Sequence, residues 1–496
     1  MAAGAIGALP LFMSYNSIAQ APAPAPRASS EGRVTGSTPT PGPADGLEPA
    51  PLDFELLGMR FRPPAGSVMR GDGAGANAVW TISERVEAPR YILKVSRLVA
   101  SDAISSPRAQ MDALVRSVSE RPSPDLVFRV LEEREFEIAG RPAGALDTLL
   151  REGTDDEEVS AVQSYHLIQV QPNEFIVISS LVPEADWPAV KPLLRRAMAT
   201  VELEDPEALA RARAERMQRG EAFLSVLTPD MLRRAVDPAP AKGEPDGRWY
   251  RITRMGADGQ PAEAGYMTVV ATEAAQGAAN PDRSEREWTA EERELGLGVR
   301  IRVRMLQDER GSRVADSDAR YWMAWDRSRE FWTVRSTSRD LGPDGTTLRA
   351  GKSTSQLGIR TAPSAGMPAR VLQVATVDLD SPATPPRKWT LPKGYLSQAE
   401  AILLARLLPR DAAGDFGFYW FDPRTGRLAQ RADLVRPTAG GVMVSTRATL
   451  EAPILEQRCD ADGRELRRSA DDGTTIEAIE PKALLDLWRR KGLPTP

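Results

Sequence analysis

The pattern of apolar and polar positions along the chain is clearest in residues 415–431. An aromatic arm, residues 416–421, and a polar arm, residues 427–431, flank the run Asp-Pro-Arg-Thr-Gly. In such a run Asp bonds its own backbone, Pro fixes φ and Gly allows a positive φ, so the stretch predicts a β-hairpin. Comparable runs lie at residues 256–259, 342–345 and 460–463. We therefore expect the second half of the chain to be a succession of antiparallel hairpins.

The strictest alternation of apolar and charged residues lies between residues 299 and 306. One phase consists of Val299, Ile301, Val303 and Met305, and the other of Arg300, Arg302 and Arg304. A period of two indicates a strand with one buried face, so the apolar set is expected inward and the arginines outward. Another hairpin is predicted between residues 320 and 336.

Two helical segments interrupt these predicted strands. Ser397 and Glu400 form a capping box that opens a helix over residues 401–408. Pro481 opens a second helix, residues 483–491. The apolar face of that second helix is formed by Leu484, Leu487 and Trp488. We expect it to pack on the sheet.

Residues 52–204 show a different order of elements. Strand patterns lie at residues 54–61, 78–82, 91–98 and 200–203. Ser106 as N-cap and Pro107 at the first helical position mark the start of one helix, and a second helix begins near Asp186. Several antiparallel strands are expected between the two helices.

A chain of 496 residues is too long for one ordinary core, so we expect several domains. The predicted parts are a signal peptide at 1–21, a disordered Pro/Ala-rich tether at 22–51, an α/β domain at 52–204, a helical connector at 205–240 and an antiparallel β-rich domain with a C-terminal helix at 241–496. The connector is expected to begin as a charged, solvated helix that ends near Gln218, with Gly220 terminating it. The predicted fold class is α+β.

The N-terminus indicates export. Residues 2–13 form a short apolar run, Ala19-Gln20-Ala21 resembles a cleavage site, and a Pro/Ala repeat follows. The first positive side chain is Arg27, so either the start codon lies upstream or the segment is a disordered tail. No later stretch is apolar for about 18 residues, so no transmembrane segment is expected beyond the signal peptide. The expected location is extracytoplasmic, either periplasmic or secreted.

Charge and residue counts narrow the function classes. Lys and Arg number 64 and Asp and Glu number 69, giving a net charge of −5, so there is no global basic field to attract nucleic acid. A single cysteine excludes an internal disulfide and a CxxC zinc site. We therefore expect no cofactor, no metal and no nucleic-acid partner.

Individual residues with reactive chemistry favour structural roles. His166 has no second ligand candidate to complete a zinc site, and no Ser/His/Asp order can be argued around it, so a tolerated strand residue is expected. Cys459 lacks a base within sequence reach. The Asp/Gly runs at residues 460–463 and 471–473 lack the spacing of a calcium loop and favour turns. The glycines of residues 71–75 lack a GK[ST] ending and predict a loop.

Clustered aromatic residues are the candidate binding feature. The candidate ligand-binding residues are Tyr321, Trp322, Trp325, Trp332, Phe418 and Trp420. Large aromatic side chains commonly fill the space between a sheet and its helices, which is one interpretation. The other is that they line an apolar cleft for a lipid or another hydrophobic ligand. No catalytic residue is assigned.

The first predicted domain resembles the PsbP-like α/β sandwich family. The resemblance is carried by FELLGMRFRPPAG, residues 54–66, and EADWPAVKPLLRRAMATVEL, residues 184–203. It covers roughly a third of the chain and includes no active-site motif. The resemblance implies a non-catalytic binding or assembly role.

The second predicted domain loosely resembles the half-barrel of exported lipoprotein carriers such as LolA and of related bacterial envelope proteins. The succession of hairpins and the C-terminal pattern DADGRELRRSADDGTTIEAIEPKALLDLW, residues 460–488, carry this resemblance. It implies a curved antiparallel sheet with a few covering helices. No residue role is transferred.

These observations lead to one preferred function and two alternatives. The preferred hypothesis is an exported, non-catalytic envelope protein that binds a protein partner or a hydrophobic small molecule such as a lipid. The first alternative is a hydrolase that uses carboxylates alone, since an Asp/Glu pair needs neither His nor Cys. The second is a purely structural or assembly protein.

Overall fold

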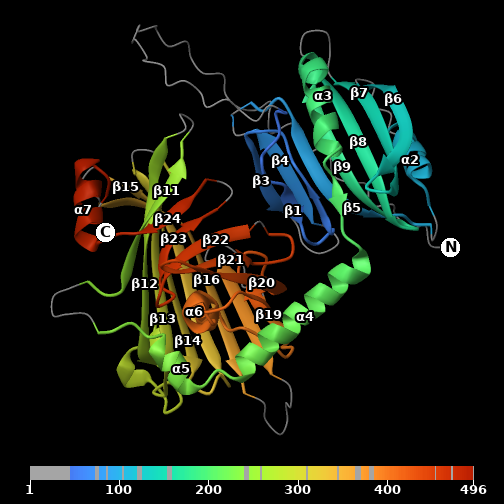
Figure 1. Cartoon of the computed structure of the whole chain (residues 1–496). Coiled ribbons are helices and arrows are strands. Elements are labelled where there is room, and N and C mark those ends of the chain that lie inside the picture. Colours follow the sequence, from blue (N-terminus) through green and yellow to red (C-terminus); the bar gives the residue numbers. More distant parts are fainter. Residues whose placement is uncertain are drawn as a thin grey trace. The chain divides into compact units, whose positions relative to one another are not determined.

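A computed structural model gives the fold of this chain. It describes residues 45–72, 78–84, 86, 88–102, 105–119, 126–152, 159–239, 245–256, 260–308, 311–342, 346–362, 370–378, 385–452, 454–470 and 473–494. Several sequence predictions lie outside the described residues: the signal peptide at 1–21, the tether as far as residue 44, the loop at 73–75, and the turn tips at 257–259, 343–345 and 471–472. The described chain forms two compact units, Met1–Asp205 and Pro206–Pro496, called unit 1 and unit 2 (Figure 1).

Unit 1 is built on a seven-stranded antiparallel sheet within the described residues, in the order β3-β4-β5-β9-β8-β7-β6. A smaller sheet has the order β1-β2-β10. The elements are β1 (Leu52–Phe54), β2 (Met59–Phe61), β3 (Ser67–Asp72), β4 (Val79–Glu84), β5 (Ile92–Val99), α2 (Pro107–Ser119), β6 (Leu126–Ile138), β7 (Arg141–Glu152), β8 (Val159–Gln171), β9 (Glu174–Pro183), η3 (Glu184–Asp186), α3 (Trp187–Met198) and β10 (Glu202–Leu203).

Two apolar clusters hold unit 1 together. One joins α3 to the sheets, through Val190 and Leu194 with Phe54 and Trp80. In the other, Met111 of α2 is fully buried among residues of β7, β8 and β9. The predicted start of α2 is confirmed, because the Ser106 hydroxyl accepts from the Ala109 backbone N–H at 3.2 Å.

Unit 2 contains a fourteen-stranded antiparallel sheet in its described part, in the order β18-β17-β16-β15-β14-β13-β12-β11-β24-β23-β22-β21-β20-β19. Its first elements are α4 (Pro206–Ser225), α5 (Pro229–Arg234), β11 (Arg248–Met255), β12 (Pro261–Ala275), η4 (Gln276–Ala279), η5 (Glu285–Glu287), β13 (Leu295–Leu306), β14 (Arg313–Ala324), β15 (Glu330–Leu341), β16 (Thr347–Thr361), β17 (Val371–Asp378) and β18 (Arg387–Thr390). The remaining elements are α6 (Gln398–Leu407), β19 (Gly414–Asp422), β20 (Arg427–Thr438), β21 (Gly441–Arg447), β22 (Ile454–Asp460), β23 (Glu465–Ser469), β24 (Thr475–Ala478) and α7 (Pro481–Arg490).

The sheet of unit 2 curves around α6, so the chain has an α+β fold with a half-barrel-like sheet. Leu403 and Leu404 of α6 share one buried cluster with Val299 of β13 and Val444 of β21, although those strands lie far apart in the sheet order. We call the side that faces α6 the concave face and the other side the outer face. In Figure 1, α6 lies against the strands, and α7 lies on another side of the sheet.

The alternation in β13 is confirmed. Leu297 and Val299 are buried in the cluster around α6, and the later apolar residues of the strand pack against it. Arg300 and Arg304 belong to the other phase and pair with Asp318 and Asp316 of β14 at 2.9 Å and 2.7 Å. Period-two patterning therefore set which face of the strand is buried.

The structure also contains three features that the sequence predicted: a hairpin turn, a capping box and the buried face of the last helix. In the hairpin of β19 and β20, the Asp422 carboxylate accepts from the Arg424 backbone N–H at 3.1 Å, and Gly426 has φ of 64°. Both halves of the capping box are present at the start of α6, since Ser397 and Glu400 each accept from the other's backbone N–H. On α7, Leu484 and Trp488 are fully buried against the sheet.

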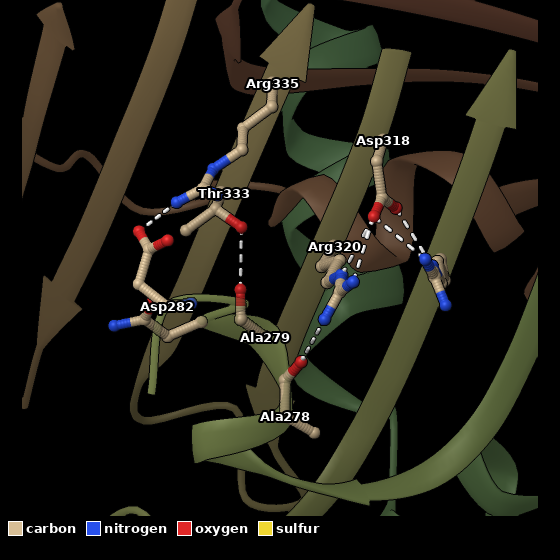
Figure 2. A network of polar contacts seen from close by, with 9 residues as sticks. Ala278, Ala279, Asp282, Asp318, Arg320, Thr333 and Arg335 are labelled. Carbon is tan, nitrogen blue, oxygen red and sulfur yellow. Dashed lines mark hydrogen bonds and ion pairs between the residues drawn. The ribbon is translucent and has the colours of Figure 1, made fainter. Parts of the chain in front are cut away.

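The connection between β12 and β13 is fixed to the outer face by polar contacts (Figure 2). The Thr333 hydroxyl of β15 donates to the Ala279 carbonyl at 2.7 Å, and Arg320 of β14 donates to the Ala278 carbonyl at 3.4 Å. Farther along β15, Arg335 forms an ion pair with Asp282. These contacts place η4 and the turn after it over β14 and β15 on the outer face.

The prediction for Gly220 is wrong, because α4 continues through it to Ser225. Gly220 is buried where α4 crosses the edge strand β19, and a Cβ atom there would lie 1.8 Å from the Gly417 carbonyl oxygen. One turn later, Phe223 packs on Phe416 and Phe418 with ring centroids 5.8 Å and 6.2 Å apart. Glycine at this position permits a close helix–strand contact.

We expect Gly220→Ala to destabilise the protein by about 2 kcal/mol, because the added methyl group overpacks the contact with β19. Helix propensity acts in the opposite direction, favouring Ala over Gly by about 1 kcal/mol in a helix interior. A loss of stability in the variant would therefore show that overpacking against β19 outweighs the gain in helix propensity. Urea unfolding would measure it, with Gly440→Ala as control, since nothing lies within 4 Å of a Cβ atom at Gly440. A stabilised Gly220→Ala variant would contradict the packing described.

Candidate functional site

The concave face of unit 2 contains a cavity of about 230 Å³ beside α6. Its lining comes from α6, from β11 to β13 on one side and from β19 to β23 on the other. The residues of α6 that line it are Gln398, Ala401, Ile402, Leu403, Ala405 and Arg406. Most of these recur at intervals of three and four and so form one helical face. On the rest of the helix, Ala399, Leu404 and Leu407 are buried in the apolar cluster.

The two strand walls of the cavity differ in character. Met267, Val269 and Ile301 of β12 and β13 make one wall largely apolar. The other wall carries ionisable side chains, including Arg431 of β20 and Glu465 of β23. A hollow with an apolar side and a few fixed polar groups is typical of a small-molecule site.

Each ionisable group in the polar wall has a partner of opposite charge. Arg431 and Asp433 form a two-pronged ion pair with hydrogen bonds of 2.7 Å and 2.8 Å, and Asp433 is fully buried. Arg468 donates to Glu465 at 2.6 Å. Charges in a poorly hydrated site need such partners, because desolvation of an unpaired ion is costly.

Trp420 connects the polar wall to the predicted aromatic candidates. Its indole N–H donates to the Ala448 carbonyl at 2.6 Å, and the Arg431 guanidinium lies 5.3 Å from its ring centroid. The ring therefore orients the arginine over its face as part of the cavity lining.

Of the other five predicted residues, Tyr321, Trp325 and Phe418 belong with Trp420 to the apolar cluster around α6, whereas Trp332 and Trp322 lie in two other clusters. Tyr321 and Trp322 line a second cavity, of about 260 Å³, which also involves η4. Trp332 is buried in a cluster with Tyr395 and other residues. Trp325 lies 5.1 Å from the Arg233 guanidinium. Phe418 is fully buried against α4. The structure thus does not bring the six into one wall, and a ligand role for any of them stays a prediction.

Sequence analysis missed the charged residues of the cavity. Arg431 and Asp433 share the phase of Val435, which is buried in the cluster around α6. Charged residues in the apolar phase of a strand were the available signal, because such residues need an internal partner. Which partner they meet depends on how neighbouring strands pair.

A buried group of ionisable residues lies beside the N-terminus of α6. We call Glu330, Arg360, Tyr395, Glu400 and Arg327 the seam cluster. The Tyr395 hydroxyl donates to Glu330 at 2.6 Å, and the Arg360 guanidinium lies 3.9 Å from the other oxygen of Glu330. Glu400 is fully buried and paired with Arg327.

The two carboxylates of the seam cluster differ in pKa. Burial raises the pKa of Glu330 to about 7, against the opposing effects of Arg360 and Tyr395. Burial also acts to raise the pKa of Glu400, but Arg327 and the Ser397 backbone N–H hold it below its ordinary value. One carboxyl therefore gains a proton near neutral pH, whereas its neighbour stays ionised.

The seam cluster lies where one segment of chain runs from β18 to β19, the two edge strands of the sheet. Residues 391–397 leave β18 at one edge and run beside β19 at the other, where the Leu396 N–H donates to the Tyr419 carbonyl at 2.7 Å. Tyr395 lies in this segment and reaches Glu330 on β15. The cluster thus fixes the segment that bridges the two edges.

His166 and Cys459 are both uncharged at neutral pH. Burial lowers the pKa of His166 to about 4, and its ring packs edge-on against Phe136. Burial raises the pKa of the Cys459 thiol to about 12, with Glu465 and Asp460 adding to the effect. Among the described residues, no group of three or more His, Cys, Asp and Glu side chains is arranged to hold a metal ion.

We expect stability to fall as pH rises from about 4.5 to about 7 through the contribution of Glu330, because the folded state retains a proton that the unfolded state releases. Glu330→Gln removes this dependence. Relative to wild type, the variant should gain on the order of 2 kcal/mol in unfolding free energy between pH 5 and pH 7.5.

Urea unfolding at the two pH values would measure the gain, and Glu456→Gln, at an exposed carboxylate on β22, is the control. An identical change with pH in wild type and Glu330→Gln would show that Glu330 titrates in its ordinary range.

The described part of the chain contains no helix with the length and apolar character needed to cross a bilayer.

No protein-family model matches the chain, and no curated protein matches its sequence. Among solved structures, a cyanobacterial PsbP from Synechocystis is similar at 14% identity and TM-score 0.26, over 34% of this chain and 99% of that one. A β-barrel-like protein of a domain of unknown function from Brucella abortus is similar at 11% identity and TM-score 0.29, over 48% of this chain and 98% of that one.

Proposed function

We propose that this chain is an exported, non-catalytic binding protein, and that unit 2 holds a small apolar or amphipathic molecule in the cavity beside α6. The observation that carries the proposal is a hollow of about 230 Å³ on the concave face, lined on one side by Met267, Val269 and Ile301. Protein interiors are close-packed, so a hollow of this size inside a core is unusual unless something occupies it.

The volume limits the class of ligand. A cavity of about 150 Å³ binds benzene, so about 230 Å³ corresponds to a molecule of about nine non-hydrogen atoms. A whole membrane lipid is too large. The proposed occupant is therefore a small molecule or a short chain, and the cavity favours this version of the function over a protein partner.

The seam cluster and the paired arginines support a binding role without adding a reaction. Glu330 and Glu400 are both buried, with side-chain exposures of 2% and 0%. Each lies beside an arginine and accepts a hydrogen bond from the segment that bridges β18 and β19. A carboxylate pair for hydrolysis needs room for substrate and water between its members.

We expect Ala401→Phe to weaken the binding of heptyl methyl ether by at least about tenfold, because the larger side chain occupies the volume that the ligand needs. Isothermal titration calorimetry on the full chain would measure the affinity. The control is Ala483→Phe, which places the same ring on the exposed side of α7. Equal affinities in wild type and Ala401→Phe, in variants that both fold, would exclude this cavity as the site.

The export part of the proposal has its own test. Residues 1–51 fused to alkaline phosphatase should give an active enzyme in a Gram-negative host, because that reporter needs disulfides that form only outside the cytoplasm. The same fusion without residues 2–13 should be inactive. An inactive first fusion would argue against this segment as an export signal.

A further inference from the structure

Glu465 contributes to the cavity lining a carboxylate that has one buried, unsatisfied oxygen. Glu465 is 8% exposed. Its Oε2 accepts from Arg468 at 2.6 Å and from the Gln457 side-chain amide at 2.9 Å. Its Oε1 is buried and has no hydrogen-bond partner in the described chain. A buried carboxylate oxygen without a donor is costly, so the site calls for a donor from outside the chain.

The position of Glu465 is fixed from both sides. It opens β23 and pairs with Cys459 of β22. The turn that precedes it lies against α6, since a Cβ atom on Gly463 would be 2.2 Å from the Ala405 carbonyl oxygen. Because neither strand nor helix can shift freely, the backbone of Glu465 is held in place at the cavity wall.

The charges around the cavity are already balanced. The three arginines that line the cavity each have a carboxylate partner. Arg431 is paired with Asp433, Arg468 with Glu465, and Arg406 of α6 with Asp237 at 2.9 Å. Burial and the charge of Glu465 raise the pKa of Tyr250 to about 12, and the Cys459 thiol is likewise uncharged.

This balance selects an uncharged ligand. A ligand carboxylate would compete with Glu465 and Asp433 for guanidiniums that already have partners. A ligand ammonium would add a positive charge that no remaining carboxylate offsets, and burying an unpaired charge is costly. A neutral hydroxyl supplies the missing donor and leaves the charges balanced.

We propose that the ligand is a small uncharged alcohol, aliphatic or phenolic, whose hydroxyl donates to Oε1 of Glu465 while its apolar body lies along Met267, Val269 and Ile301. This inference rests on the proposed function and names the ligand class for the same cavity. The hydroxyl gives orientation, and the apolar wall gives most of the contact area.

The test compares n-octanol with heptyl methyl ether. The two are isomers with the same number of non-hydrogen atoms, and both carry an oxygen that accepts hydrogen bonds, but only the alcohol donates. Calorimetry on the full chain should show n-octanol binding at least about tenfold more tightly, as expected for one hydrogen bond to a carboxylate. Octylammonium and octanoate should both bind more weakly than n-octanol.

A paired substitution tests the assignment to Glu465. Glu465→Leu combined with Arg468→Met removes both partners and leaves no buried charge unpaired. In this variant the preference for alcohol over ether should fall to near one. The control combines Glu456→Leu on β22 and Arg467→Met on β23, which makes the same changes at exposed positions and should keep the preference.

The outcomes separate the inference from the function on which it rests. Equal binding of n-octanol and the ether to wild type would overturn the alcohol assignment, as if a bound water served Oε1, while leaving a binding cavity in place. Binding of neither isomer would overturn both. Tighter binding of octylammonium than of n-octanol would also overturn the alcohol assignment. The wild-type comparison decides these points even if the paired variant fails to fold.

Discussion

Burial of α6 against a curved sheet is the constraint on which unit 2 depends. A helix that is covered on most sides must be apolar almost all round, and the residues from Ala399 to Leu407 largely meet this demand. The polar groups at its N-terminus have no water to satisfy them. They are served instead by the Ser397 capping box, by Arg327 on Glu400, and by the bond from Gln398 to the Phe421 carbonyl.

The same constraint explains why charges on the concave face occur in pairs. Asp433 and Glu465 face a core in which desolvation would disfavour either ion by itself, and each has a guanidinium at hydrogen-bonding distance. Pairing satisfies most of their lone pairs, and the cavity forms where the helix leaves space between the apolar and the paired walls. Glu465 retains one oxygen without a hydrogen-bond donor, so the polar wall favours a ligand that donates a hydrogen bond.

An open sheet also needs protection at its edges, because unpaired strand edges invite association with other chains. Here α4 covers β19, with Gly220 allowing the helix backbone to approach the strand. The segment before α6 runs beside the same strand and connects it to β18, and Tyr395 ties that segment to Glu330. Edge protection and the burial of α6 therefore depend on the same short stretch of chain.

Several elements were determined by the sequence alone. The turn at Asp422–Gly426 and the capping box at Ser397 rest on contacts within a few residues. The buried phase of β13 and the apolar face of α7 follow from the spacing of apolar residues along one element, so they too can be predicted from the local sequence. Gly220 was misinterpreted because a glycine in a helical pattern signals either an end or a close contact, and only the neighbouring β19 distinguishes the two. The cavity likewise arose from tertiary structure. Arg431, Glu465 and α6 are distant in the chain, and the curvature of the sheet brings them together.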